Sequence, residues 1–178
     1  MSKILILSSS PRPNGNSNIL CDEFTRGAKE SGHEVEKINV ARVKVAGCLG
    51  CGACQKNGGI CVQKDDMDEI RGKMLAADII VLASPIYYYS MAAQLKLVID
   101  RTYAFFMQLA GKRFYYIFSC AAPDESYTKT MIASLDGFTC CVPDAKVAGI
   151  IQGVGTGEAG EVKTTKAMQD AYEMGKNI

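Results

Sequence analysis

Apolar runs alternate with amphipathic stretches along the whole chain, and this pattern predicts a protein in which strands and helices alternate. Five runs are typical of strands in a parallel sheet. They are Ile4–Leu7, Val35–Val40, Asp78–Ala83, Lys112–Cys120 and Ala145–Ile151. Five further stretches have apolar residues at helical spacing. They are Asn18–Glu30, Asp65–Ala77, Met91–Phe105, Ser126–Cys141 and Glu161–Lys176. This alternation predicts a doubly wound parallel sheet with helices on both faces.

The most usual strand order for a five-stranded sheet of this kind is 2-1-3-4-5. In that order, the loops after the first and third strands meet at the switch point of the sheet, where ligands bind. Two distinctive stretches of the chain fall on these two loops. Because both stretches fall on loops that meet, we predict a ligand site at the carboxyl edge of the sheet.

The first stretch, Ser8–Asn18, is rich in hydroxyl and amide side chains and leads into the first predicted helix. A helix N-terminus favours an anion through its free N–H groups and its dipole, and Arg12 can add a charge-assisted hydrogen bond. The stretch has neither the G-x-x-x-x-G-K-[ST] motif nor the G-x-G-x-x-G motif. We therefore expect it to hold a terminal monophosphate. The alternative is an ordinary polar loop with a helix cap at Asn16 or Ser17.

The second stretch, Ser84–Ser90, places a rigid proline and three tyrosines after the most apolar predicted strand. Aromatic side chains in such a position offer a platform for a flat ring. The alternative is that the tyrosines are rim residues or part of an oligomer surface. Ser119 begins a third candidate ligand loop on the same edge. The glycine-rich stretch 153–160 follows the last strand rather than the first, so we predict a mobile loop there.

Four of the eight cysteines fall in the loop 47–61 with the spacing C-x2-C-x2-C-x6-C. They are Cys48, Cys51, Cys54 and Cys61. Closely spaced thiolates of this kind are typical of a cubane iron–sulfur cluster. Zinc also accepts four thiolates, although structural zinc sites usually have two separated pairs. Thiols without a metal, or a disulfide, are the third interpretation.

Composition narrows the class of protein. A chain of 178 residues, 48% of them hydrophobic, predicts one α/β domain over 1–178. The net charge of +1 gives no electrostatic reason to expect nucleic acid or a membrane surface as a partner. The chain begins directly with a strand and has no apolar run of membrane-spanning length, so we expect a cytoplasmic protein. In that compartment, clustered cysteines indicate metal or redox chemistry rather than a disulfide scaffold.

With these motifs in view, nearly the whole chain resembles the NAD(P)H-dependent FMN reductases of the flavodoxin-like superfamily, and more narrowly their iron–sulfur flavoprotein branch. Ser9–Ser17 resembles the phosphate loop of this family. Ser84–Tyr87 and the following Ala93–Arg101 resemble its flavin-ring loop and the next helix. The four clustered cysteines, followed by Asp65–Met67, resemble the cysteine motif of the iron–sulfur branch.

The resemblance implies a flavodoxin-like fold and noncovalent FMN, with the phosphate on the first loop and the ring against the tyrosine loop. The candidate cofactor-binding residues are Ser9, Ser10, Arg12, Asn16, Ser17, Asn18, Pro85, Ile86, Tyr87, Tyr88, Tyr89, Ser90 and Ser119. No side chain is predicted to act as a catalytic acid or base, which is usual where the cofactor carries the redox chemistry.

The expected activity is that of an FMN-dependent oxidoreductase. The resemblance implies NAD(P)H or a ferredoxin-like protein as donor, a quinone, free flavin or other small molecule as acceptor, and a homodimer or homotetramer. A [4Fe-4S] cluster on the cysteine loop would relay single electrons to FMN. Two other classes are open: a flavodoxin-like electron carrier and a thiol or metal redox sensor. The near-neutral charge argues against the carrier, because such carriers are usually strongly acidic.

Overall fold

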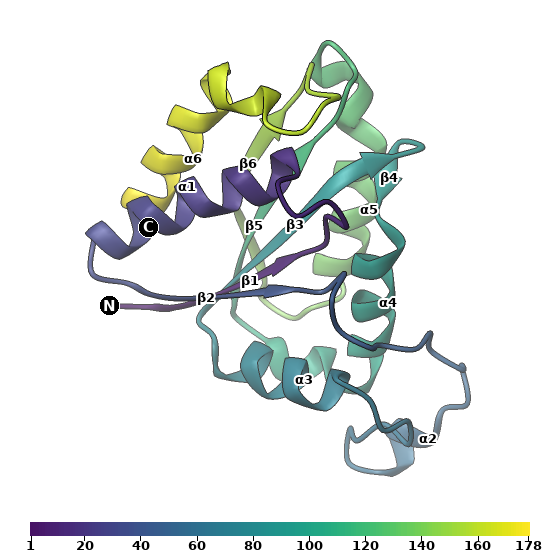
Figure 1. The fold of residues 1–178 in the computed structure, drawn as a ribbon. Coiled ribbons are helices and arrows are strands. Elements are labelled where there is room, and N and C mark those ends of the chain that lie inside the picture. Colours follow the sequence, from purple (N-terminus) through teal and green to yellow (C-terminus); the bar gives the residue numbers. More distant parts are fainter.

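Five parallel strands form the central sheet of the computed structural model, which describes residues 1–178 (Figure 1). They are β1 (Lys3–Ser8), β2 (Glu34–Asn39), β3 (Ile79–Tyr87), β5 (Arg113–Ser119) and β6 (Lys146–Gly153). Their order is β2-β1-β3-β5-β6, and every pair is parallel. The predicted order 2-1-3-4-5 is confirmed once the short strand β4 (Ser90–Met91), which pairs antiparallel with the end of β3, is set apart.

Two layers of helices enclose the sheet. The helices are α1 (Asn16–Glu30), α2 (Ala53–Lys56), α3 (Met67–Ala76), α4 (Ala93–Arg101), α5 (Lys129–Thr139) and α6 (Lys166–Lys176). Four 3-10 turns accompany them: η1 (Thr102–Ala104), η2 (Phe106–Leu109), η3 (Glu125–Thr128) and η4 (Glu161–Thr164). Helices α1 and α6 cover one face, while α3, α4 and α5 cover the other (Figure 1). None of the helices combines the length and apolar character needed to cross a membrane.

Three predicted helices begin or end in 3-10 turns, so their α-helical parts are shorter than the sequence pattern indicates. Met91 belongs to β4, and the stretch after Arg101 winds into 3-10 turns, so only the middle of the predicted helix Met91–Phe105 is an α-helix. The other two begin with η3 and η4, and an extended Thr165 separates η4 from α6. Apolar spacing alone does not distinguish a 3-10 turn from the first turn of an α-helix.

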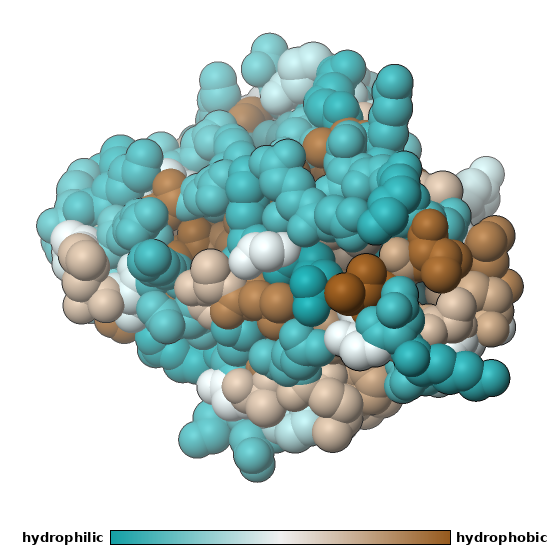
Figure 2. All heavy atoms as spheres, turned by 90° about the horizontal axis from the view of Figure 1, so that it is seen from below, coloured by the Kyte–Doolittle hydropathy of each residue, from teal (hydrophilic) through white to brown (hydrophobic).

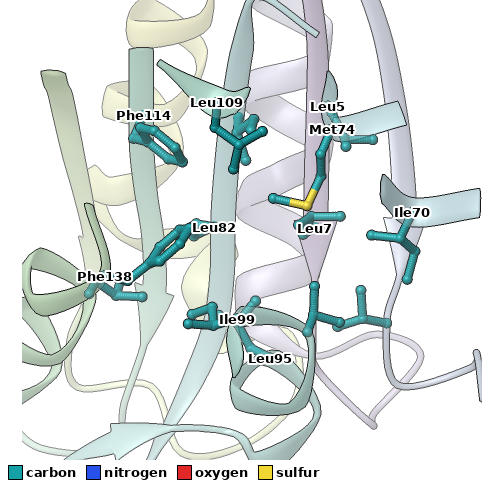
Figure 3. Close-up of a cluster of buried hydrophobic side chains, with 14 of the residues drawn as sticks. Leu5, Leu7, Ile70, Met74, Leu82, Leu95, Ile99, Leu109, Phe114 and Phe138 are labelled. Atoms are coloured by element: carbon teal, nitrogen blue, oxygen red, sulfur yellow. The ribbon is translucent and has the colours of Figure 1, made fainter. Parts of the chain in front are cut away.

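The core lies in two clusters, one on each face of the sheet, because successive side chains of a strand point to opposite faces. Leu5 and Leu7 of β1 belong to the cluster beneath α3, α4 and α5, with Leu82 of β3 beside them (Figure 3). Ile4 and Ile6 belong to the cluster beneath α1 and α6. The outer surface seen from below is mostly hydrophilic, with separate hydrophobic patches (Figure 2). Burial of these two clusters accounts for the unbroken apolar character of β1 and β3.

Helices α1 and α6 approach each other at two glycines. A Cβ atom on Gly27 would lie 2.1 Å from the Tyr172 carbonyl oxygen, and one on Gly175 would lie 2.1 Å from the Phe24 carbonyl oxygen. Neither distance leaves space for a side chain. This close packing places the segment before α6 over the N-terminal end of α1, where it contributes to the site.

Candidate functional site

A cavity of about 210 Å³ opens at the carboxyl edge of the sheet. It is lined by residues from the loops or ends that follow β1, β3, β5 and β6. They are Ser10, Arg12, Gly15, Asn16, Pro85, Ile86, Tyr87, Ser119, Cys120, Ala121, Thr156 and Gly157. The two stretches singled out in the sequence therefore meet here, at the switch point of the parallel sheet.

The N-terminus of α1 forms one wall of the cavity. Its cap residue is Gly15, and no side chain accepts a hydrogen bond from the first turn. The alternative prediction of a side-chain cap at Asn16 or Ser17 is therefore wrong. A Cβ on Gly15 would lie 2.2 Å from the Ser10 Oγ, so this position keeps the loop folded tightly on itself. The uncapped N–H groups and the helix dipole together suit an anion.

Ser17 carries an unsatisfied polar group in the first turn of α1. Its side chain is completely buried, and its Oγ has no hydrogen-bond partner. A buried hydroxyl left without a partner costs about 1–3 kcal/mol. A phosphate oxygen at the helix N-terminus would accept this hydrogen bond. The residues present thus fit the phosphate of FMN.

Several of the predicted phosphate ligands instead shape the loop. Asn18 donates from Nδ2 to the Arg12 carbonyl at 2.9 Å and accepts a hydrogen bond from the Ser8 hydroxyl. Ser9 donates from Oγ to the Ala83 carbonyl at 2.9 Å, which ties β1 to β3. Ser9, Ser17 and Asn18 are not among the residues that line the cavity.

Asn16 joins the first loop to the glycine-rich segment 153–160. Its Nδ2 donates to the Glu158 carbonyl at 2.8 Å, and its Oδ1 accepts from the Gly160 N–H at 2.9 Å. Arg12 donates from Nη1 to the Gly157 carbonyl at 3.0 Å. These hydrogen bonds attach to the first loop the segment for which we predicted a mobile loop. They also bring Thr156 and Gly157 to the cavity wall. In the sequence, the only signal for this role was that glycines follow the last strand.

The predicted ring-binding stretch is a β-hairpin rather than a loop. Strand β3 continues to Tyr87, which pairs with Ser90 of β4, and the turn between them consists of Tyr88 and Tyr89. Tyr87 lines the cavity, whereas the other two tyrosines and Ser90 do not. The hydroxyl of Ser84 accepts from the Ala92 N–H at 2.9 Å and holds the base of the hairpin.

Both turn residues have left-handed backbone angles, with φ of 47° at Tyr88 and 63° at Tyr89. Two-residue hairpin turns with this geometry favour Asn-Gly, because bulky residues are strained there by about 1–3 kcal/mol each. Tyr88 is fully exposed, and the ring of Tyr89 stacks on that of Tyr127, with centroids 6.4 Å apart and planes inclined by 18°. The hairpin tip is thus strained and aromatic.

Cys120 is the ionisable cavity residue whose pKa the surroundings shift. Burial raises the pKa of its thiol, and a backbone hydrogen bond at Ala122 opposes the shift only in part. The thiol therefore stays neutral at physiological pH and is a poor nucleophile. The cavity offers hydrogen bonds, one guanidinium and apolar surface, which suits binding of a cofactor that carries the chemistry itself.

The cysteine loop lies apart from the cavity. Hydrogen bonds join the two ends of the loop at a place that we call its neck. The carboxylate of Asp65 accepts from the Ala46 N–H at 3.0 Å, and that of Asp66 accepts from the Lys44 N–H at 2.7 Å. Arg101, at the end of α4, donates to Asp65 at 2.7 Å and to the Ala46 carbonyl at 2.9 Å. Arg101 is 2% exposed, so this ion pair is buried.

The ion pair also affects protonation. Burial acts to raise the pKa of Asp65, but hydrogen bonds from Arg101 and from the Ala46 and Met67 N–H groups outweigh it and hold that pKa below its ordinary value. Asp65 is therefore charged at neutral pH. Asp65 and Arg101 belong to two separate sequence motifs, and the structure shows that they meet.

The four thiols themselves do not converge. Cys48 and Cys51 are exposed, Cys54 and Cys61 are half-buried, and all are free thiols. No three cysteine, histidine or acidic side chains come together as metal ligands. The arrangement does not fit a bound metal or cluster, and the prediction of a cluster gains no support from the geometry.

Comparisons with known proteins show the family to which the chain belongs. The family model of NADPH-dependent FMN reductases matches residues 2–135. An iron-sulfur flavoprotein of Archaeoglobus fulgidus is 41% identical over 99 residues, and one of Methanocaldococcus jannaschii is 42% identical over 100 residues. Each match covers 56% of this chain, and they cover 44% and 51% of the two relatives. The chain thus spans about half the length of the curated relatives it matches.

Solved structures show the same fold at low sequence identity. The NAD(P)H:quinone oxidoreductase of Methanothermobacter marburgensis has a TM-score of 0.75 at 18% identity, covering 99% of this chain and 95% of the other. An FMN-dependent NADH-azoreductase of Bacillus anthracis, solved with FMN, has a TM-score of 0.72 at 19% identity, covering 99% and 97%. Together with the cavity at the switch point, the family match over residues 2–135 settles the classification. The chain belongs to the NADPH-dependent FMN reductase family.

Proposed function

We propose that the protein is an FMN-dependent oxidoreductase that passes electrons from NAD(P)H to a small acceptor. The observation that carries this proposal is the buried, unpartnered hydroxyl of Ser17 beside an uncapped helix N-terminus at the switch point. Family membership supports the choice of FMN, and the printed names of the two similar structures support NAD(P)H as donor and a quinone or azo compound as acceptor.

The phosphate of FMN would lie at the N-terminus of α1. Ser17 would donate the hydrogen bond that its hydroxyl lacks, and the first N–H groups of the helix would donate others. Ser10 lies on the cavity wall, with its Oγ 3.3 Å from both the N–H and the carbonyl of Arg12, and can turn toward the ligand. The guanidinium of Arg12, already on the wall, adds the positive charge that a dianionic phosphate requires.

The isoalloxazine ring would lie toward the tyrosine hairpin. Pro85, Ile86 and Tyr87 provide the apolar wall, and Ser119 lies opposite on the neighbouring strand. The cavity of about 210 Å³ is smaller than the roughly 300 Å³ at which typical small-molecule pockets begin. We therefore place only part of FMN inside it, with the ring extending over the rim.

When bound, FMN supplies the hydride and electron transfer. The protein positions it: the β1–α1 loop binds the phosphate, the hairpin orients the ring, and the 153–160 segment, held by Asn16, closes the cavity from the β6 side. The cysteine loop takes no part in this electron path, because its sulfurs do not converge. The proposal also includes one flavin-binding domain over 1–178. It further includes a homo-oligomer, as the resemblance implies.

The test is an anaerobic purification followed by a visible absorption spectrum and an assay of NAD(P)H oxidation on the same sample. Flavin bands that persist through gel filtration, with steady oxidation of NAD(P)H by ferricyanide, are the expected result. A colourless protein that does not retain added FMN would contradict the proposal. Flavin without NAD(P)H oxidation would make a non-enzymatic electron carrier the better description.

A further inference from the structure

Two adjacent cysteines, Cys140 and Cys141, follow the C-terminal end of α5, away from both the flavin cavity and the cysteine loop. Both are exposed free thiols. Cysteine is among the residue types most often buried, and neither of these two belongs to a core cluster. Packing of the fold therefore gives no reason for the pair, and the proposed electron path does not use it.

The end of α5 directs the two thiols to one place. The Sγ atoms of Cys140 and Cys141 lie 3.5 Å and 3.4 Å from the same acceptor, the Gly137 carbonyl oxygen. This carbonyl is among the last four of α5, which lack the usual partner within the helix. Partial desolvation and the Cys141 thiol, which is within hydrogen-bond reach, raise the pKa of Cys140. The two sulfurs thus stand side by side, and Cys140 is a neutral thiol at physiological pH.

An apolar groove of about 380 Å³ adjoins the pair, and Cys141 is one of its lining residues. It lies between α4, the η1 and η2 turns, and α5. Ile99 and Phe138 line it and also belong to the core, so their positions are fixed. Tyr103 and Phe106 add two stacked rings, with centroids 6.2 Å apart and planes inclined by 13°. The volume falls in the range of about 300–1,000 Å³ that is typical of small-molecule pockets.

Gly137 connects the thiol pair with the groove. Its carbonyl accepts from both thiols, and it also lines the groove. Glycine destabilises a helix relative to alanine, yet a Cβ at this position would meet no atom within 4 Å. Packing within the chain therefore does not require glycine here. Its missing side chain leaves space next to the two sulfurs.

We propose that Cys140 and Cys141 form a dithiol site for a trivalent arsenical that carries an aryl group, with arsenic on the two sulfurs and the ring in the groove. Thiolate sulfur is a soft ligand and prefers soft, thiophilic centres. Two thiols on one chain bind such a centre far more tightly than one thiol, because the second bond forms within the same molecule. The apolar groove beside Cys141 favours an aryl group on the arsenic over a bare oxyanion.

The binding step balances without a further component. An aryl arsenic(III) oxide and two thiols give a cyclic dithioarsenite and one water molecule. Two S–H bonds and the arsenic–oxygen double bond break, and two arsenic–sulfur bonds form. The oxygen leaves as water with both thiol protons. Arsenic stays trivalent, so neither an oxidant nor a reductant is needed.

The first experiment titrates phenylarsine oxide into the reduced full chain by calorimetry. Cys140→Ser and Cys141→Ser are each expected to weaken the binding about a hundredfold, because either change leaves a single sulfur. The matched control is Cys48→Ser together with Cys51→Ser, since these thiols are also free and exposed. This control is expected to bind as tightly as the unaltered protein.

Three results would overturn the inference. A loss in the control would assign the binding to the cysteine loop. A loss in only one of the two single variants would indicate one reactive thiol and not a dithiol. Unchanged affinity in both single variants would exclude the pair altogether.

The second experiment separates the groove from the sulfurs. Arsenite binds thiols but has no aryl group, so the ratio of its Kd to that of phenylarsine oxide measures the contribution of the groove. Tyr103→Ala is expected to lower this ratio about fivefold, and Tyr103→Phe to restore it. The matched control is Tyr127→Ala, because Tyr127 is also exposed and stacked, on Tyr89, but does not line the groove. An unchanged ratio in Tyr103→Ala would exclude the groove from the site.

This inference is independent of the proposed function, and the two fail separately. Because both cysteines are exposed and distant from the cavity lining, the single serine variants are expected to keep the Tm, FMN retention and NAD(P)H oxidation of the unaltered protein. The affinity for phenylarsine oxide is expected to be the same with and without FMN. Binding that requires FMN would place the arsenical in the flavin cavity and overturn the inference.

Discussion

The flavin cavity and the cysteine loop show two ways of holding polar groups. Around the cavity, buried hydroxyls and amides are bonded to backbone atoms of distant segments, as Asn16 is to Glu158 and Gly160. In the cysteine loop, which contains α2 at the lower edge of Figure 1, the thiols are exposed or half-buried. Apart from its neck, the loop is bonded to the η1 turn, because Gln55 donates from Nε2 to the Tyr103 carbonyl at 3.1 Å. The cavity is therefore built for a ligand of defined shape, whereas the bonds of the loop join it to the N-terminal end of α3, to α4 and to η1, and not to the sheet.

The difference follows from where each region joins the core. The cavity residues continue directly from buried strands, so packing of the sheet determines their positions. The loop joins the core at the ion pair between Asp65 and Arg101, whose partners are 36 residues apart in sequence. Four predictions test this contrast.

Breaking the neck of the loop should have the largest effect on stability. Arg101→Met leaves the Asp65 carboxylate buried without its cation, and removing one partner of a buried pair costs about 3–5 kcal/mol. Urea unfolding measures the loss. Arg26→Met is the control, because Arg26 forms its ion pairs with Glu23 and Glu30 on the exposed surface. We expect FMN retention by the folded Arg101→Met protein to be unchanged; a parallel loss of flavin would show that the two regions are coupled.

The same ion pair predicts a pH dependence of stability. The pKa of Asp65 is depressed in the folded protein. Its contribution is therefore present above the unfolded value of about 3.9 and is lost as the pH falls through the lower folded value. Asp65→Asn should be less stable than the unaltered protein at pH 7, and this difference should shrink below about pH 4. A difference that is constant from pH 7 to pH 3 would mean that charge on Asp65 does not stabilise the neck.

In the first turn of α1, next to the cavity, Ser17→Ala should separate FMN affinity from stability. The hydroxyl has no partner in the folded chain, so its removal should leave the stability of the flavin-free protein equal or slightly higher. Loss of its hydrogen bond to phosphate should weaken FMN about tenfold. Fluorescence titration of FMN gives the affinity, and Ser134→Ala, on the exposed side of α5, is the control. Unchanged affinity would remove Ser17 from the phosphate site.

The smallest effect is expected in the cysteine loop. Replacing Cys48 and Cys51 together by serine should change the free energy of unfolding by no more than about 0.5 kcal/mol, because exposed side chains contribute little. FMN retention should also be unchanged. Iron and acid-labile sulfide are assayed on the anaerobically purified unaltered protein. About four irons per chain would show that the loop closes around a cluster. The loop would then be a built site, as the cavity is.

Much of the cavity was predictable from local sequence. Ser10 and Arg12 follow β1, and Pro85 follows the apolar run of β3, so the strand order alone brings them to one edge. Their predicted contact with FMN stays a prediction. The periodicity that defines each strand is a local property, and in a doubly wound sheet it also determines which loops become neighbours.

Other features depend on contacts between segments that are distant in the chain. The segment 153–160 has the composition of a free loop, yet Asn16, 142 residues from Glu158, holds it against the cavity. The Tyr88–Tyr89 stretch reads as a loop, but pairing with β4 makes it a strained turn stacked on Tyr127.

The sequence by itself determined the sheet, its strand order and the edge at which a ligand binds, because these follow from the periodicity of apolar residues and from the few topologies open to such a chain. Only the tertiary structure decided that Thr156 and Gly157 close the cavity, that Asp65 pairs with Arg101, and that the clustered thiols stay apart. Cysteine spacing sets how far apart thiols can be along the chain, but the folded path of the loop sets whether their sulfurs meet.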